Sequence, residues 1–172
     1  QGINLNGYSI ADISGNDIHH SNDTGIGVYS NSTAEISGND IYYNSSYGID
    51  VYETATANIT STLFWKNRRT YAVNRTGIQM EGGGEVAYNC FWNNSATGEG
   101  LPSAFGEVIT VNANGDSSDT WSNLFMDPGM VSGDPLSNST WEHYGEDYTL
   151  KVGVPQEWDL YYVNYYSIFD AP

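Results

Sequence analysis

The sequence predicts an all-β solenoid of about four short rungs, followed by an irregular, aromatic-rich C-terminal segment. Three observations support this fold class: a unit of ~23 residues recurs, apolar residues alternate with polar ones inside each unit, and turn-forming residues keep the same places. The string ISGNDI, for example, stands at residues 13–18 and again at 36–41.

The repeated units follow one another in order along the first half of the chain. They span residues 2–24, 25–47 and 48–70, and a fourth begins at residue 77 after a six-residue insert at 71–76. The fourth unit is two residues shorter in its middle. Units that keep the same turn positions are expected to stack in register.

Each unit contributes residues to three apolar columns, and each column predicts one short strand. The first column holds Ile3, Ile26, Ile49 and Ile78, followed two positions later by Leu5, Val28, Val51 and Met80. The second holds Ala11, Ala34 and Ala57, followed by Ile13, Ile36, Ile59 and Val86, and the third holds Ile18, Ile41, Phe64 and Phe91. A spacing of two puts apolar residues on one face of a strand, so three strands make one rung and rungs stack about 4.8 Å apart.

The repeated pattern GIxVxxxxxAxISGNDIxxN resembles the repeat of right-handed parallel β-helix proteins, the pectin-lyase-like superfamily with its NosD-like and disaggregatase-like groups. The resemblance covers about residues 2–94, and residues 123–134 with 148–150 look like the closing segment of such proteins. It implies a short right-handed parallel β-helix. The superfamily includes lyases, glycoside hydrolases, phage fibres, adhesins and surface-layer proteins, so the resemblance leaves the function open.

These observations divide the chain into two parts. Residues 1–135 are expected to form the β-helix, with a surface excursion around 95–120 that is rich in Gly, Ser and Asn. Residues 136–172 are expected to form a C-terminal cap or a strand-donating tail.

Charge and composition exclude several functions. The chain carries 21 acidic and 5 basic residues, for a formal charge of -16, so it is not expected to bind nucleic acid or anionic membrane. No apolar run reaches the ~18 residues of a spanning helix, so no membrane insertion is expected. Only 15% of residues are charged, which is typical of secreted or surface proteins and predicts an extracellular or cell-surface location.

Asn-X-Ser/Thr sequons are about twice as frequent as chance order would give. The seven lie at Asn22, Asn31, Asn44, Asn58, Asn74, Asn93 and Asn138. Asn58 stands between two inward residues and must point outward, while Asn22, Asn44 and Asn93 fall at a turn that is expected to tolerate a glycan. Covalent N-glycans are predicted, with a polar turn composition as the alternative origin of the sequons.

One Asn column is predicted to be structural. Asn16, Asn39 and Asn89 occupy equivalent turn positions, with Thr62 in the third unit. Stacked Asn side chains can hydrogen-bond from rung to rung, which favours a ladder over a catalytic role.

A second column is aromatic and lies just after the third apolar column. His19 leads it, and Tyr42, Trp65 and Trp92 follow. If these rings face outward, Tyr42, Trp65 and Trp92 form an interface for sugar rings or for another subunit. The alternative is that other residues of the same chain cover them.

Acidic residues also stack. Asp12 and Glu35 share one column, and Asp17 and Asp40 share another. Like charges one rung apart cost free energy unless they are hydrated, protonated or bridged by a cation, and Ca²⁺ suits oxygen-rich sites. Both solvated carboxylates and a Ca²⁺ site therefore remain open, and no other cofactor is suggested.

A histidine metal site is not expected from the neighbours His19 and His20, because adjacent residues on a strand point to opposite faces. For catalysis, Asp50 with Glu53 are candidate carboxylates, and Lys66, Arg68 and Arg69 are candidate bases of the kind that the resembling lyases use. Nothing in the spacing fixes their geometry. Four or five rungs also give a stack of only 20 to ~25 Å, which is short beside the grooves of the resembling enzymes. Enzyme activity therefore stays uncertain.

The two ends of the chain suggest self-assembly. The first unit begins at residue 2 without a preceding cap, so either the sequence is a piece of a longer chain or something else covers this rung, most naturally another copy of the protein. The tail at residues 158–169, WDLYYVNYYSIF, is rich in strand-forming residues and either folds back as a cap or adds to a neighbour. Its candidate assembly residues are Trp158, Tyr161, Tyr162, Tyr165, Tyr166 and Phe169.

The predicted function is therefore an extracellular structural subunit that binds copies of itself head to tail in a filament, sheath or surface layer. The alternative is a carbohydrate-active β-helix protein, either a polysaccharide lyase or hydrolase fragment or a sugar-binding module.

Overall fold

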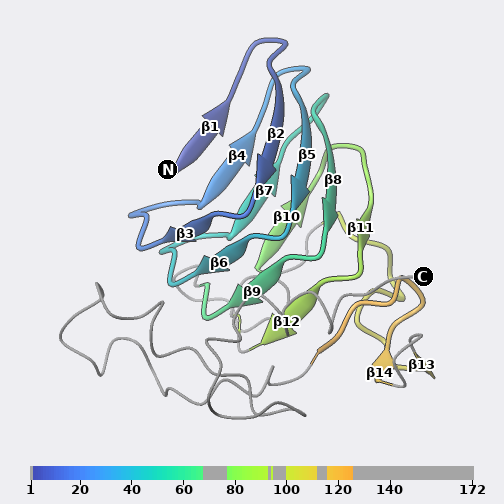
Figure 1. Ribbon diagram of the computed structural model, residues 1–172. Coiled ribbons are helices and arrows are strands. Elements are labelled where there is room, and N and C mark those ends of the chain that lie inside the picture. Colours follow the sequence, from blue (N-terminus) through green and yellow to red (C-terminus); the bar gives the residue numbers. More distant parts are fainter. Residues whose placement is uncertain (1, 68–76, 93, 95–99, 112–115, 126–172) are drawn as a thin grey trace, which may run out of the picture.

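The computed structural model describes residues 2–67, 77–92, 94, 100–111 and 116–125, and in them the chain winds into a parallel β-solenoid (Figure 1). Three four-stranded parallel sheets form its sides, and each rung contributes one strand to each sheet. This all-β stack confirms the predicted fold class. No helix in the described residues is long and apolar enough to cross a membrane.

The strands repeat in the same order in every rung. The first sheet contains β1 (Ile3–Leu5), β4 (Ile26–Val28), β7 (Ile49–Val51) and β10 (Ile78–Met80). The second contains β2 (Ile10–Ser14), β5 (Thr33–Ser37), β8 (Thr56–Thr60) and β11 (Val86–Ala87). The third contains β3 (Asp17–His19), β6 (Asp40–Tyr42), β9 (Leu63–Trp65) and β12 (Cys90–Trp92).

The register of the strands follows the apolar columns of the sequence. Ile3 pairs with Ile26, Ile26 with Ile49, and Ile49 with Ile78. Identical side chains therefore meet between neighbouring rungs and fill the core that the three sheets enclose. Burial is complete in the middle of the stack, where Ile26 and Ile49 are 0% exposed, whereas Leu5 in the first rung is 6% exposed.

Two corners of the rungs use the same backbone device, a residue with positive φ followed by a ladder residue. At the first corner φ lies between 49° and 64°, at Gly15, Gly38, Ser61, Tyr88 and Ser122. At the second corner φ lies between 50° and 53°, at His20, Tyr43 and Lys66. The left-handed conformation turns the chain sharply, so the next side chain points back along the stack.

The first corner carries the predicted Asn ladder. The Oδ1 of Asn39 accepts hydrogen bonds from the backbone N of Asn16 at 3.0 Å and from its Nδ2 at 3.1 Å. The Oδ1 of Asn89 accepts from the backbone N of Thr62 at 3.0 Å. The ladder continues to Asn123, whose Oδ1 accepts from the backbone N of Asn89 at 2.9 Å.

A second ladder, which the sequence reading missed, runs along the second corner through Ser21, Asn44, Asn67 and Asn94. The Oδ1 of Asn44 accepts from the backbone N of Ser21 at 3.0 Å, and the Oδ1 of Asn94 accepts from that of Asn67 at 3.0 Å. Both ladders lie in the turns, and their side-chain hydrogen bonds connect each rung to the next.

The fourth rung is two residues shorter in its middle, and there its backbone passes very close to the third rung. Gly84 has φ 121°, and a Cβ at this position would collide with the carbonyl oxygen of Ala57. Only glycine fits such a contact with that backbone conformation.

Residues 123–125 begin a fifth rung, in agreement with the predicted closing segment, whose remainder lies outside the described residues. Leu124 forms a parallel bridge with Cys90, and the ring of Phe125 stacks on that of Phe91 at 5.2 Å. Cys90 is buried. The expected surface excursion contains a two-stranded antiparallel ribbon, β13 (Thr110–Val111) with β14 (Ser117–Ser118).

Candidate functional site

The first rung presents three strand edges at one end of the stack. β1, β2 and β3 each stand at the end of their sheet, so among the described residues each pairs with one neighbour only (Figure 1). Asn16 starts the first ladder as a donor to Asn39, and its own Oδ1 accepts no hydrogen bond from the described residues. Ile10 on β2 is 86% exposed and Tyr8 beside it is 79% exposed.

The aromatic column stacks on the outer side of the third sheet. Ring centroids are 5.0 Å apart between His19 and Tyr42, 5.0 Å between Tyr42 and Trp65, and 6.1 Å between Trp65 and Trp92. These residues stand outside the main core cluster, yet Tyr42 is 2% and Trp65 1% exposed, while Trp92 is half-buried. The same chain therefore covers Tyr42 and Trp65, and this burial disagrees with an open interface at these two rings.

Lys66 is held beside this column. Its Nζ donates a hydrogen bond to the Tyr43 hydroxyl at 2.9 Å and lies 5.7 Å from the Trp65 ring centroid. It follows β9 on the third sheet, whereas Asp50 lies on β7 of the first sheet. The structure does not bring these two candidate catalytic groups to one face, and Arg68 and Arg69 lie outside the described residues.

Asp17 and Asp40 pair in register on the third sheet, on neighbouring rungs. Burial raises the pKa of Asp17, against the opposing effects of His19 and of a side-chain hydrogen bond with Asp40. Burial also raises the pKa of the neighbouring Tyr42 far above its usual range, and the charges of Asp17 and Asp40 add to this effect.

The other acidic column has a different partner. Asp12 pairs in register with Glu35, and Glu35 pairs with Asn58, whose Nδ2 donates to its Oε1 at 2.8 Å. Among the residues that the structure describes, no group of three or more His, Cys, Asp or Glu side chains is arranged to hold a metal ion. Ca²⁺ binding by the two acidic columns stays a prediction.

His19 and His20 lie on the same side, contrary to expectation. Their Nδ1 atoms are 2.9 Å apart, so one ring donates a hydrogen bond to the other. The strand rule fails because His20 already has the left-handed φ of the corner, 53°. Burial lowers the pKa of His19, opposed by Asp17, and burial together with the charge of His19 lowers the pKa of His20.

The sequon asparagines occupy different environments. Asn22 and Asn31 are exposed, and Asn58 is half-buried. Asn44 is 1% exposed, and its Nδ2 donates to the carbonyl oxygen of Ile18 at 3.1 Å and to Oδ1 of Asn67 at 2.9 Å. A glycan on that nitrogen is incompatible with the folded ladder, so the expectation for Asn44 is corrected.

Several predicted residues cannot be placed. The sequons at Asn74, Asn93 and Asn138 lie outside the described residues. So do the candidate assembly residues of the tail, which are Trp158, Tyr161, Tyr162, Tyr165, Tyr166 and Phe169.

The outer side of the first sheet combines a tyrosine with a carboxylate. The Tyr29 hydroxyl donates to Oδ2 of Asp50 at 3.1 Å, and its ring lies over Gly27, where a Cβ would collide with it. Asp50 pairs in register with Gln79 on the next rung, and Tyr52 beyond it is 40% exposed. Glu53 is exposed in the turn that follows β7.

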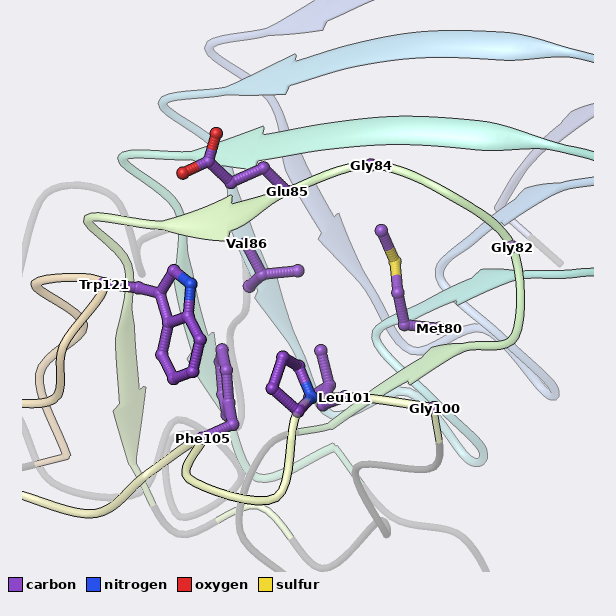
Figure 2. A pocket seen from close by; sticks show the side chains of 10 residues that line it. Met80, Gly82, Gly84, Glu85, Val86, Gly100, Leu101, Phe105 and Trp121 are labelled. Atoms are coloured by element: carbon purple, nitrogen blue, oxygen red, sulfur yellow. The ribbon is translucent and has the colours of Figure 1, made fainter.

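A small cavity of about 190 Å³ lies below the fourth rung (Figure 2). Met80 and Val86 line it from the rung, and Leu101, Phe105 and Trp121 line it from the opposite side. Among the described residues that line it, Glu85 is the one ionisable residue. A single carboxylate does not provide the paired acid and base of glycoside hydrolysis.

Comparison with known proteins supports the fold. Residues 1–116 match the family described as right-handed beta helix region. No curated protein and no solved structure matches the chain.

Proposed function

Since the chain belongs to the right-handed β-helix family, we propose that it is an extracellular structural subunit whose copies stack end to end. The observation that carries this proposal is the edge of the first rung. Three strands of one rung, β1, β2 and β3, each lack a second neighbour among the described residues, and all three edges lie at the same end. Unpaired strand edges are templates for another chain.

The edge is chemically suited to another rung of the same pattern. An added rung would offer backbone N–H groups to Oδ1 of Asn16, which continues the ladder that Asn39 and Asn89 form inside the stack. It would also cover Leu5, which is 6% exposed here, whereas Val28, at the same place in the second rung, is 0% exposed. Contact between unlike ends is heterologous and builds a filament unless the rotation closes a ring.

Charge sets the conditions for assembly. Each copy carries a formal charge of -16, so copies repel and association strengthens with ionic strength. Ca²⁺ bound at the columns of Asp12 with Glu35 and of Asp17 with Asp40 would also strengthen association, at a lower concentration than a monovalent salt. Glycans at the exposed sequons Asn22 and Asn31 are part of the proposal, since both lie on the outside of the turns.

A sugar-binding role is a second candidate, favoured by the outer side of the first sheet. Tyr29, Asp50 and Tyr52 present a hydroxyl, a carboxylate and an exposed ring, and Gln79 follows on the next rung. Aromatic faces with nearby polar groups suit pyranose rings.

Electron microscopy and sedimentation of the full chain test the proposal, over a range of protein and salt concentrations, with and without chelator. We expect filaments or sheets that lengthen with concentration. Ile10→Lys places a charge on the β2 edge and is expected to weaken stacking at least tenfold. Thr33→Lys is the matched control, because it adds the same charge to the same column one rung inside the stack.

Discrete monomers under every condition, or equal behaviour of Ile10→Lys and Thr33→Lys, would contradict end-to-end stacking. Polysaccharide binding that is lost in Asp50→Asn would then support the sugar-binding role.

A further inference from the structure

The β13–β14 ribbon projects beside the C-terminal end of the described stack (Figure 1). Its two strands pair antiparallel, with Thr110 opposite Ser118 and Val111 opposite Ser117, and Ser118 bridges to Leu124 of the fifth rung. Within the described residues the ribbon has two strands only, so β13 has one edge without a strand partner.

β13 and the two residues before it carry three of the six large apolar side chains that the described residues leave exposed. Val108 is 47% exposed, Ile109 68% and Val111 62%. All three are β-branched residues with a high preference for paired strands. Their burial by a partner strand is favourable, whereas inside this chain they remain in solvent.

The ribbon is also a place where two acidic copies can approach. Residues 108–115 contain no charged side chain, in a chain of formal charge -16, and Glu107 and Asp116 flank this neutral stretch. A second copy offers the same neutral, apolar edge. Antiparallel pairing of an edge with itself is self-complementary and forms a closed two-fold contact.

We propose that the β13 edge binds the β13 edge of a second copy, which gives a four-stranded antiparallel sheet across a two-fold axis. The contact does not involve the first-rung edge, so it holds whether or not copies stack end to end. So short an edge buries less than the roughly 1,200 Å² of a stable interface, and the isolated pair is therefore weak. Repeated along two stacks, the same contact joins them side by side through multivalency.

Cysteine scanning tests the two-fold geometry directly. Cys90 is the single cysteine of the chain and is buried, so cross-links between copies are expected only from a cysteine that is introduced at the surface. Full-length Val108→Cys, Ile109→Cys, Thr110→Cys and Val111→Cys are oxidised mildly and separated without reductant. Identical residues meet only near a two-fold axis, where paired Cα atoms lie within disulfide reach of roughly 4.4–6.8 Å.

We expect one position, or two adjacent ones, to form a covalent dimer and the others not. Ile10→Cys is the control, because end-to-end stacking brings unlike ends together and leaves identical residues apart. The proposal would be overturned if all four variants gave no more covalent dimer than the Ile10→Cys control.

Sedimentation in the Ile10→Lys background separates this contact from stacking. There we expect a weak monomer–dimer equilibrium, and Val111→Lys should raise its dissociation constant at least tenfold. Thr33→Lys adds the same charge away from the ribbon and should leave it unchanged. Since an added lysine reduces the net negative charge of each copy, a loss of dimer cannot come from increased overall repulsion. An unchanged dimer in Val111→Lys, or no dimer at all in the Ile10→Lys background, would contradict the ribbon contact even if stacking is demonstrated.

Discussion

Asn67 uses both ends of its amide group inside the stack. Its Oδ1 accepts from the backbone N of Asn44 at 3.3 Å and from its Nδ2 at 2.9 Å. Its Nδ2 donates to the carbonyl oxygen of Ile41 at 2.7 Å and to Oδ1 of Asn94 at 3.1 Å. The side chain is 0% exposed, so water cannot replace these partners without opening the rung.

Asn67→Ala is therefore expected to lower the free energy of unfolding by about 2–4 kcal/mol, because it leaves buried donors and acceptors unpaired. Asn22→Ala removes an exposed amide and should change it by less than about 0.5 kcal/mol. Urea denaturation followed by circular dichroism measures both. Equal stability of the two variants would show that the second ladder does not stabilise the fold.

The second ladder was not predicted because one of its asparagines is also part of a sequon. Asn44 is followed by two serines, so a sequon and a ladder position give the same local sequence. The first rung has Ser21 in place of Asn, which hides the column at its start. The signal that was present is the recurrence of Asn at 44, 67 and 94, at the spacing of the repeat once the insert is counted.

At the scale of one element, each corner couples a left-handed residue to a ladder side chain. Glycine takes that conformation in the first two rungs at Gly15 and Gly38, but Ser61 and Tyr88 take it in the next two. Non-glycine residues enter this region at a cost that the surrounding stack must offset. Single-residue preferences do not predict a left-handed Tyr88, because the neighbouring rungs impose it.

The third rung has the weakest link in the first ladder. The backbone N of Asn39 reaches Oγ1 of Thr62 at 3.5 Å, whereas the backbone N of Asn16 reaches Oδ1 of Asn39 at 3.0 Å. The shorter threonine side chain holds its partner less closely.

Thr62→Asn is expected to restore the ladder and to raise the free energy of unfolding by about 1 kcal/mol. Thr33→Asn on an exposed outer position is the control and should stay within about 0.5 kcal/mol of the parent chain. Thermal and urea denaturation provide the comparison. A destabilised Thr62→Asn variant would mean that the corner has no room for the longer amide.

At the scale of the whole molecule, the repeated columns predicted every strand of the four rungs and their pairing register, because one apolar face recurs in the same phase. The ribbon and the burial of Tyr42 and Trp65 could not be predicted in this way. The ribbon occurs once, without a repeat to reveal it, and burial of an outward ring depends on what covers it. The pairing of His19 with His20 likewise depends on a corner conformation that an ideal strand lacks.

A stack of rungs has its least protected members at its ends, since an end rung has one neighbour instead of two. We expect amide hydrogen exchange to be faster in β1, β2 and β3 than in β5 and β8. Under assembly conditions, protection should increase in β1 to β3 and stay constant in β5 and β8. Uniform exchange along the stack would indicate one cooperative unit, and unchanged β1 to β3 in the assembled form would place the contact elsewhere.

The alignment of the hydrogen bonds also gives the molecule a direction of mechanical weakness. Strand pairing and both ladders run from rung to rung, along the axis of the stack. A pulling force along that axis breaks the hydrogen bonds of one rung at a time. Each rung of 23 residues that opens adds roughly 80 Å to the length of the extended chain. Under tension the protein would lengthen in steps and absorb work, and a rung that closes again would restore its length.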